Sequence, residues 1–108
     1  MTTAALGTWD AEIASPIGKQ SVVFEFTVDA AERLSGSATD KYGVVEMHDV
    51  SVDGPHLTWT QHVTRPLRLI LRFDVEVDDD VMHGKATAGV LPASRVLANR
   101  RNIANLRE

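Results

Sequence analysis

The stretch LRLILRFDVEV, residues 67–77, alternates apolar and mostly charged side chains without interruption. The odd-numbered positions are all apolar: Leu67, Leu69, Leu71, Phe73, Val75 and Val77. The even-numbered positions are mostly charged: Arg68, Ile70, Arg72, Asp74 and Glu76. Successive side chains of a strand point to opposite faces, so this period of two predicts one long strand with a buried face and a solvated face.

The same alternation continues from the start of the chain to about residue 88, most clearly over residues 21–28 and 56–63. Turn-forming residues interrupt it at regular intervals, which is typical of an all-β meander. They separate eight strands, the first at about residues 7–14, the third at Leu34–Ala38 and the eighth at about residues 94–100. The strongest hairpin signal is Asp53-Gly54, where we expect a type I′ turn with positive φ at both residues.

Eight antiparallel strands in so short a chain would expose two edges and an apolar face if they remained an open sheet. Closure removes both problems, so the sequence predicts an all-β, eight-stranded antiparallel up-and-down barrel, with a two-sheet sandwich as the competing fold. We expect one barrel domain over residues 1–100 and a basic C-terminal tail or helical turn over residues 101–108.

The composition excludes several classes of function. The 108 residues hold 11 Lys and Arg against 15 Asp and Glu, a net charge of −4, which has the wrong sign for a nucleic-acid partner. There is no cysteine, and hence no disulfide and no thiolate nucleophile. The chain has no apolar run of membrane-spanning length and no signal-peptide pattern, so we expect a cytoplasmic protein without a membrane partner.

Gly7-Thr8-Trp9 near the start and Arg100 near the end form a pairing that resembles the lipocalin and calycin barrels. The layout also resembles a family of short bacterial barrel domains, through Ser15-Pro16-Ile17-Gly18, Leu34-Ser35-Gly36, Asp53-Gly54 and Met82-His83-Gly84. The resemblance implies a calycin-like barrel in which the late Arg packs over the indole at the closed end. This chain is much shorter than the true lipocalins and lacks their disulfide.

Strand parity places a set of apolar side chains inside the barrel, where they are expected to line a cavity for a small hydrophobic molecule. Gln61 interrupts the inward row of Leu57, Trp59 and Val63, and a buried amide must be hydrogen-bonded to protein or ligand. Met82, Gly84, Ala86 and Ala88 are small or flexible and would leave room inside. The predicted ligand-binding residues are Phe24, Phe26, Met47, Trp59, Gln61, Leu69 and Phe73.

Two orientations are open for the strand that contains His48. Strict alternation from Val50 and Val52 would bring Glu46 and His48 into the cavity as an acid/base pair, whereas a β-bulge near His48-Asp49 would turn Met47 inward and His48 outward. In the first case the candidate catalytic residues are Glu46, His48 and Tyr42, the last of which is expected at a mouth of the barrel.

No metal or cofactor is expected. A zinc site of His48, His62 and His83 would require imidazoles that parity places on different faces, and Asp78-Asp79-Asp80 lacks the spacing of a calcium loop.

Three functions remain open. The first is binding of a small hydrophobic molecule inside the barrel. The second is a cofactor-independent isomerase, cyclase or lyase that uses a cavity carboxylate or histidine for proton transfer. The third is an assembly module that docks through residues 67–77 and the basic tail. A homodimer is compatible with all three.

Overall fold

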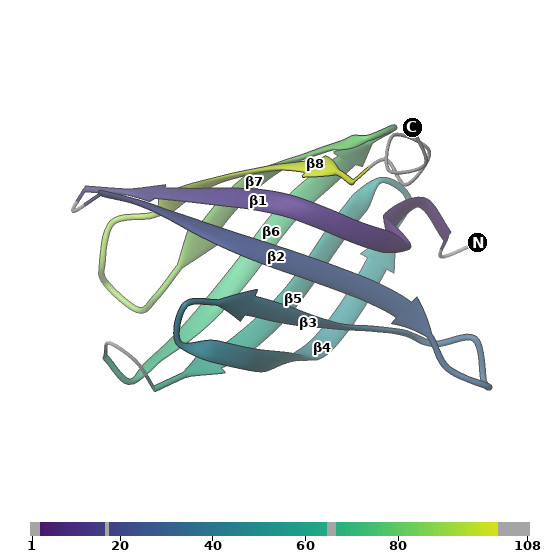
Figure 1. Ribbon diagram of the computed structural model, residues 1–108, viewed down its shortest axis with the longest axis horizontal. Helices are drawn as coiled ribbons and strands as arrows, with labels where there is room; N and C mark the ends of the chain where they lie inside the picture. The colour runs from purple at the N-terminus through teal and green to yellow at the C-terminus, as the bar shows by residue number, and fades with distance from the viewer. Residues whose placement is uncertain (1–2, 17, 65–66, 102–108) are drawn as a thin grey trace.

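The computed structural model describes residues 3–16, 18–64 and 67–101, and these residues form a closed antiparallel barrel (Figure 1). After a short 3-10 helix, η1 (Thr3–Ala5), eight strands follow in order around the wall: β1 (Gly7–Ser15), β2 (Gly18–Val28), β3 (Leu34–Asp40), β4 (Gly43–Asp53), β5 (His56–Val63), β6 (Leu69–Asp78), β7 (Val81–Thr87) and β8 (Ser94–Arg100). The predicted all-β up-and-down barrel is confirmed, and the sandwich alternative is excluded.

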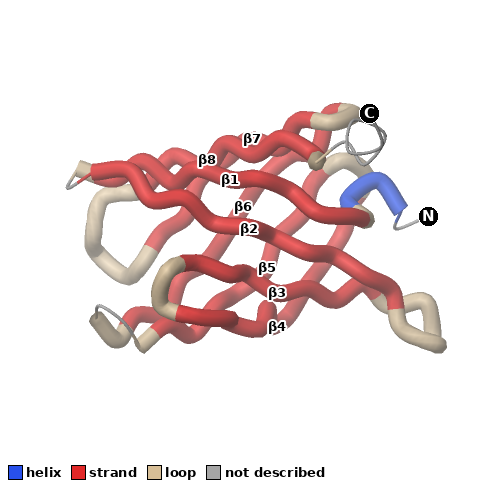
Figure 2. Tube along the Cα trace, viewed as in Figure 1, coloured by secondary structure: helices blue, strands red, loops and turns tan. Residues whose placement is uncertain are grey.

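Closure is made by β1 and β8, which pair antiparallel with Trp9 opposite Arg100 and Ile13 opposite Val96. Every other strand pairs with its neighbour in sequence, so the wall is continuous (Figure 2). A closed wall leaves no strand edge unpaired, which removes the hazard that an open sheet of this composition would carry.

Two local predictions are corrected by the backbone. The long strand begins at Leu69 rather than Leu67, and Leu67 lies 63% exposed in the preceding loop. The β4–β5 turn is not type I′, since Asp53 pairs with His56 and the central residues are Gly54 and Pro55. Gly54 has φ 63°, and the proline ring fixes a negative φ at the next position, which is the pattern of a type II′ turn.

The centre of the barrel is filled by aromatic rings in mutual contact. Trp59 stacks on Phe73 with ring centroids 4.8 Å apart, and Phe24 meets both rings edge-to-face at 5.2 and 5.8 Å. Phe26 meets Trp59 at 5.4 Å. All four are at most 1% exposed, so they supply much of the apolar burial that stabilises the fold.

One end of the barrel is closed by the start of the chain. The Trp9 indole is fully buried, and its Nε1 donates to Ala5 O in η1 at 2.9 Å. Arg100 covers the ring, with its guanidinium carbon 4.4 Å from the ring centroid. The same guanidinium donates to the carbonyl oxygens of Ala4 and Leu6. The Arg-over-Trp contact implied by the resemblance is therefore present, and it holds η1 across this end.

The chain continues for one described residue after β8. Arg101 N donates to Thr8 O at 2.7 Å, and its side chain pairs with Asp10. This pairing lowers the pKa of the Asp10 carboxyl, chiefly through the hydrogen bond from Arg101. The remainder of the predicted basic tail lies outside the described residues.

Candidate functional site at the open end of the barrel

The end opposite η1 is bounded by the β1–β2, β3–β4, β5–β6 and β7–β8 connections, which gather on the left of Figure 1. The residue pairing across β4, β5 and β6 shows which side chains line the inner wall at this end. Met47 lies opposite Gln61 and Gln61 lies opposite Leu71, so the three side chains form a row across β4, β5 and β6. This row lies directly beyond the Trp59–Phe73 stack, at the boundary between the filled core and the open end.

Gln61 is the one polar side chain among the buried described residues, with 5% exposure. Trp59 Nε1 donates to Gln61 Oε1 at 2.9 Å, which fixes the amide with its oxygen toward the core. An amide nitrogen has two donors, and no described residue accepts from Gln61 Nε2. A donor is therefore available at the base of the open end, as expected for a residue that could hold a ligand oxygen.

The wall beyond Gln61 is mostly apolar and only partly covered, with Gln20 and Asp40 as polar residues near the rim. The inward-facing side chains of intermediate exposure at this end are Ile13, Val45, Val63, Leu69 and Leu71. The neighbouring loops add exposed apolar residues, namely Tyr42 at 41%, Leu67 at 63%, Leu91 at 51% and the fully exposed Val90. Apolar side chains thus continue from the inner wall onto the rim, whereas the other end is capped by η1.

Gln20 is a second polar residue on the inward-facing side of its strand, and the sequence analysis did not identify it. Gln20 Nε2 donates to Asp40 Oδ2 at 2.8 Å, linking β2 to β3 near the rim. The signal was available, because Gln20 shares parity with Val22 and Phe24. The Asp40 carboxylate also accepts from Tyr42 N at 2.8 Å, and this bond orders the turn that carries the Tyr42 ring.

A β-bulge decides the orientation of β4. The β4–β5 register shifts between His48 and Ser51, and Asp49 adopts φ 54°. The extra residue turns Met47 into the core at 7% exposure and leaves Glu46 and His48 exposed on the outer wall. The cavity placement of Glu46 and His48 is therefore wrong, and neither can act as the enclosed acid or base that the enzyme hypothesis requires.

The predicted ligand-binding residues divide into two groups. Phe24, Phe26, Trp59 and Phe73 pack against one another as the core. Met47, Gln61 and Leu69 lie at the base and wall of the open end. The second group lies closer to the rim than the stacked rings do.

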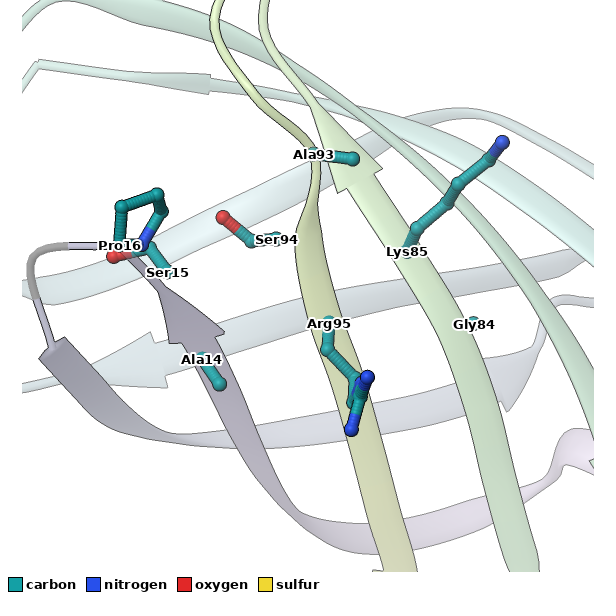
Figure 3. A pocket seen from close by; sticks show the side chains of 8 residues that line it. All are labelled: Ala14, Ser15, Pro16, Gly84, Lys85, Ala93, Ser94 and Arg95. Atoms are coloured by element: carbon teal, nitrogen blue, oxygen red, sulfur yellow. The ribbon is translucent and has the colours of Figure 1, made fainter.

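An open groove of about 480 Å³ lies at the same end, on the outside of β1, β7 and β8 (Figure 3). Its lining includes Ser15, Pro16, Ser94, Lys85 and Arg95. Lys85 and Arg95 occupy opposed positions on β7 and β8, but Figure 3 shows their charged ends pointing away from each other. The two cations do not converge on a common point, so the groove lacks the geometry of an anion site.

The described residues contain no group of three or more His, Asp or Glu side chains placed to hold a metal ion. His83, on the outer face of β7, lies opposite Glu76 and Leu97, away from His48 and His62 on β4 and β5. Within residues 3–16, 18–64 and 67–101, no helix is long and apolar enough to cross a membrane.

Together these features define a closed eight-stranded antiparallel barrel, capped at one end and apolar at the other. Searches against protein-family models, curated proteins and solved structures each returned no significant match to this chain.

Proposed function

We propose that this protein is a calycin-like binding barrel that takes a small hydrophobic molecule at its open end. The observation that carries the proposal is the Gln61 side chain: a buried amide with its oxygen bonded to Trp59 and its nitrogen donors available, surrounded by partly exposed aliphatic wall residues. A ligand there would bury apolar surface worth about 25 cal/mol per Å² before the costs of association.

The position of Gln61 suggests which molecules would be preferred. No described residue accepts from Gln61 Nε2, and this atom is not fully buried, so a carbonyl or ether oxygen could bind it in place of water. The proposed ligand class is therefore a compact apolar molecule with at least one acceptor oxygen near its inner end. The calycin relation is itself part of the proposal, and the Trp9–Arg100 contact supports it.

The test is a titration with Nile red, a neutral dye whose emission rises in apolar surroundings and which carries a carbonyl oxygen. We expect saturable binding with one dye per chain. Leu69→Arg introduces a charge into the apolar wall and should abolish it. Leu97→Arg is the matched control, because Leu97 is 46% exposed on the outer face of β8.

Gln61→Leu tests the polar contact separately. It removes the donor, so it should weaken Nile red binding while leaving or improving the binding of a hydrocarbon of similar size. Circular dichroism and urea unfolding establish that each variant is folded. Absence of saturable binding to the folded wild-type protein, or equal losses in Leu69→Arg and Leu97→Arg, would refute the proposed site.

A further inference from the structure

The β-bulge in β4 has a second effect, on the outer wall of the barrel. By turning Met47 inward, it leaves His48 on the same outer face as His62 of β5. His48 is opposite Thr60, so His62 is its diagonal neighbour, at a separation that long or aromatic side chains can span. Their rings lie at right angles with centroids 5.0 Å apart, and both side chains are exposed.

This separation matches the separation of two imidazoles that share a metal ion. With metal–nitrogen bonds of about 2.1 Å and a tetrahedral angle at the metal, the two ring centroids are roughly 5 Å apart. The rings are therefore already at this spacing, and rotation about their exposed side-chain torsions can direct a nitrogen of each ring to one point. Parity alone did not reveal this, because strict alternation separates His48 from His62.

We propose that His48 and His62 form a two-imidazole site for a divalent transition metal ion on the outside of the barrel. Imidazole nitrogen suits copper, nickel and zinc, and for a given site of this kind affinity is greatest for Cu²⁺. Since the described residues supply no cluster of three ligands, water completes the coordination.

The charges around the pair are mixed. Glu46 lies two residues before His48 on the same face, and Asp49 follows it in the bulge, so two carboxylates favour a cation here. Arg72 is opposite Thr60 on β6 and opposes a cation. Arg68 continues the same alternation as Arg72, so the nearby charges are evenly divided.

The bulge places Asp49 in an uncommon backbone conformation and changes the direction of the His48 side chain. Asp49 adopts φ 54°, a left-handed conformation that non-glycine residues rarely occupy. Bulges of this kind commonly re-aim a side chain. Asp is one of the residue types that tolerate this conformation, and the bulge here places His48 on the face that carries His62.

The experiment is a Cu²⁺ titration of the full chain, followed by calorimetry and by electron paramagnetic resonance. We expect one site whose spectrum shows two coordinated imidazole nitrogens. Because loss of even an outer-shell partner costs about 10- to 100-fold in metal affinity, His48→Asn and His62→Asn should each weaken binding at least roughly tenfold. Each single variant should also show one imidazole nitrogen fewer.

His83→Asn is the matched control, since His83 is exposed on the outer wall at β7 and has no histidine among its cross-strand partners. It should bind Cu²⁺ as the wild type does. Binding that survives unchanged in the folded His48→Asn/His62→Asn double variant would overturn the proposal, as would an equal loss in His83→Asn. These outcomes are independent of ligand binding at the open end, because both histidines lie on the outer wall.

Discussion

Arg100 offers the most direct test of how the barrel is closed. Its side chain is 26% exposed and lies over the Trp9 ring. It donates from Nε to Asp80 Oδ1 at 2.8 Å and from one terminal nitrogen to Ala4 O at 2.6 Å. It also donates to Leu6 O. One side chain thus joins β8 to η1 and to the β6–β7 turn.

Arg100→Met keeps much of the aliphatic stem but removes the charge and every one of these donors. A cation–π contact contributes about 0.5–2 kcal/mol, and a hydrogen bond to a charged group contributes about 1.5–3 kcal/mol. These contributions do not add fully, because the freed carbonyls on the surface regain water. We expect the free energy of unfolding to fall by about 2–4 kcal/mol, and the melting temperature by roughly 10–20 °C for a domain near 100 residues.

The assay is urea unfolding followed by tryptophan fluorescence, with calorimetry for the melting temperature. Arg95→Met is the control, because Arg95 is an exposed arginine on the same strand and a surface change of this kind normally alters stability by less than about 0.5 kcal/mol. If Arg100→Met were no more destabilising than Arg95→Met, the argument that Arg100 holds η1 across the closed end would fail.

Two further predictions concern other parts of the wall. A Cβ at Gly84 would lie 2.1 Å from Asp74 O, a backbone atom, so Gly84→Ala should cost about 1–3 kcal/mol or more in urea unfolding. Gly36→Ala should cost less, because its nearest atom is the flexible Met47 Sδ at 2.7 Å and its nearest backbone atom, Glu25 O, is 2.9 Å away rather than 2.1 Å; equal costs would refute this reasoning. The Asp74 carboxylate raises the pKa of His56 chiefly through their hydrogen bond, so the folded state binds that proton more tightly than the unfolded chain. The resulting stabilisation is fully present below the unfolded pKa of about 6.5 and is lost as pH rises through the higher folded value, so the stability advantage of wild type over His56→Asn should shrink as the pH rises above about 6.5. A pH-independent difference between these two proteins in urea unfolding would count against the pair.

The fold followed from the sequence because its determinants are local and repeated. The alternation at residues 67–77 recurs in other strands, and each connection contains its own turn chemistry. The expected bounds matched for β5 and β8 and, to within one residue, for β1, whereas the other strands differed more, since strand ends depend on pairing with neighbours that the local pattern does not show. Leu67 illustrates this, because it continues the apolar parity but lies before the first β5–β6 pair, Val63 with Leu69.

The candidate site was less predictable, for two physical reasons. Parity specifies which residues face inward but not whether they meet, so it could not distinguish a cavity lined by Phe24, Trp59 and Phe73 from a core filled by them. A bulge also shifts the alternation by one residue; the bulge near His48-Asp49 could be named from the sequence only as one of two alternatives, because a single Asp in a left-handed conformation leaves no distinctive composition. Gln61 was identified because it interrupts an apolar row within a regular strand, where alternation holds.

The two ends of the barrel interior thus hold different kinds of side chain. Toward η1 the interior holds Trp9, Phe26 and the stacked rings, all at most 1% exposed and held under Arg100. Toward the other end the inner wall is mostly aliphatic and only partly covered, with the Gln20–Asp40 pair near the rim and the Gln61 amide, whose nitrogen has no described acceptor, at its base. Exposed apolar surface contributes nothing to folding, so the open end has no structural reason to be apolar on both wall and rim. On the proposed function, that surface is the part of the wall that a ligand covers, while the aromatic half supplies the stability that allows the other half to remain open.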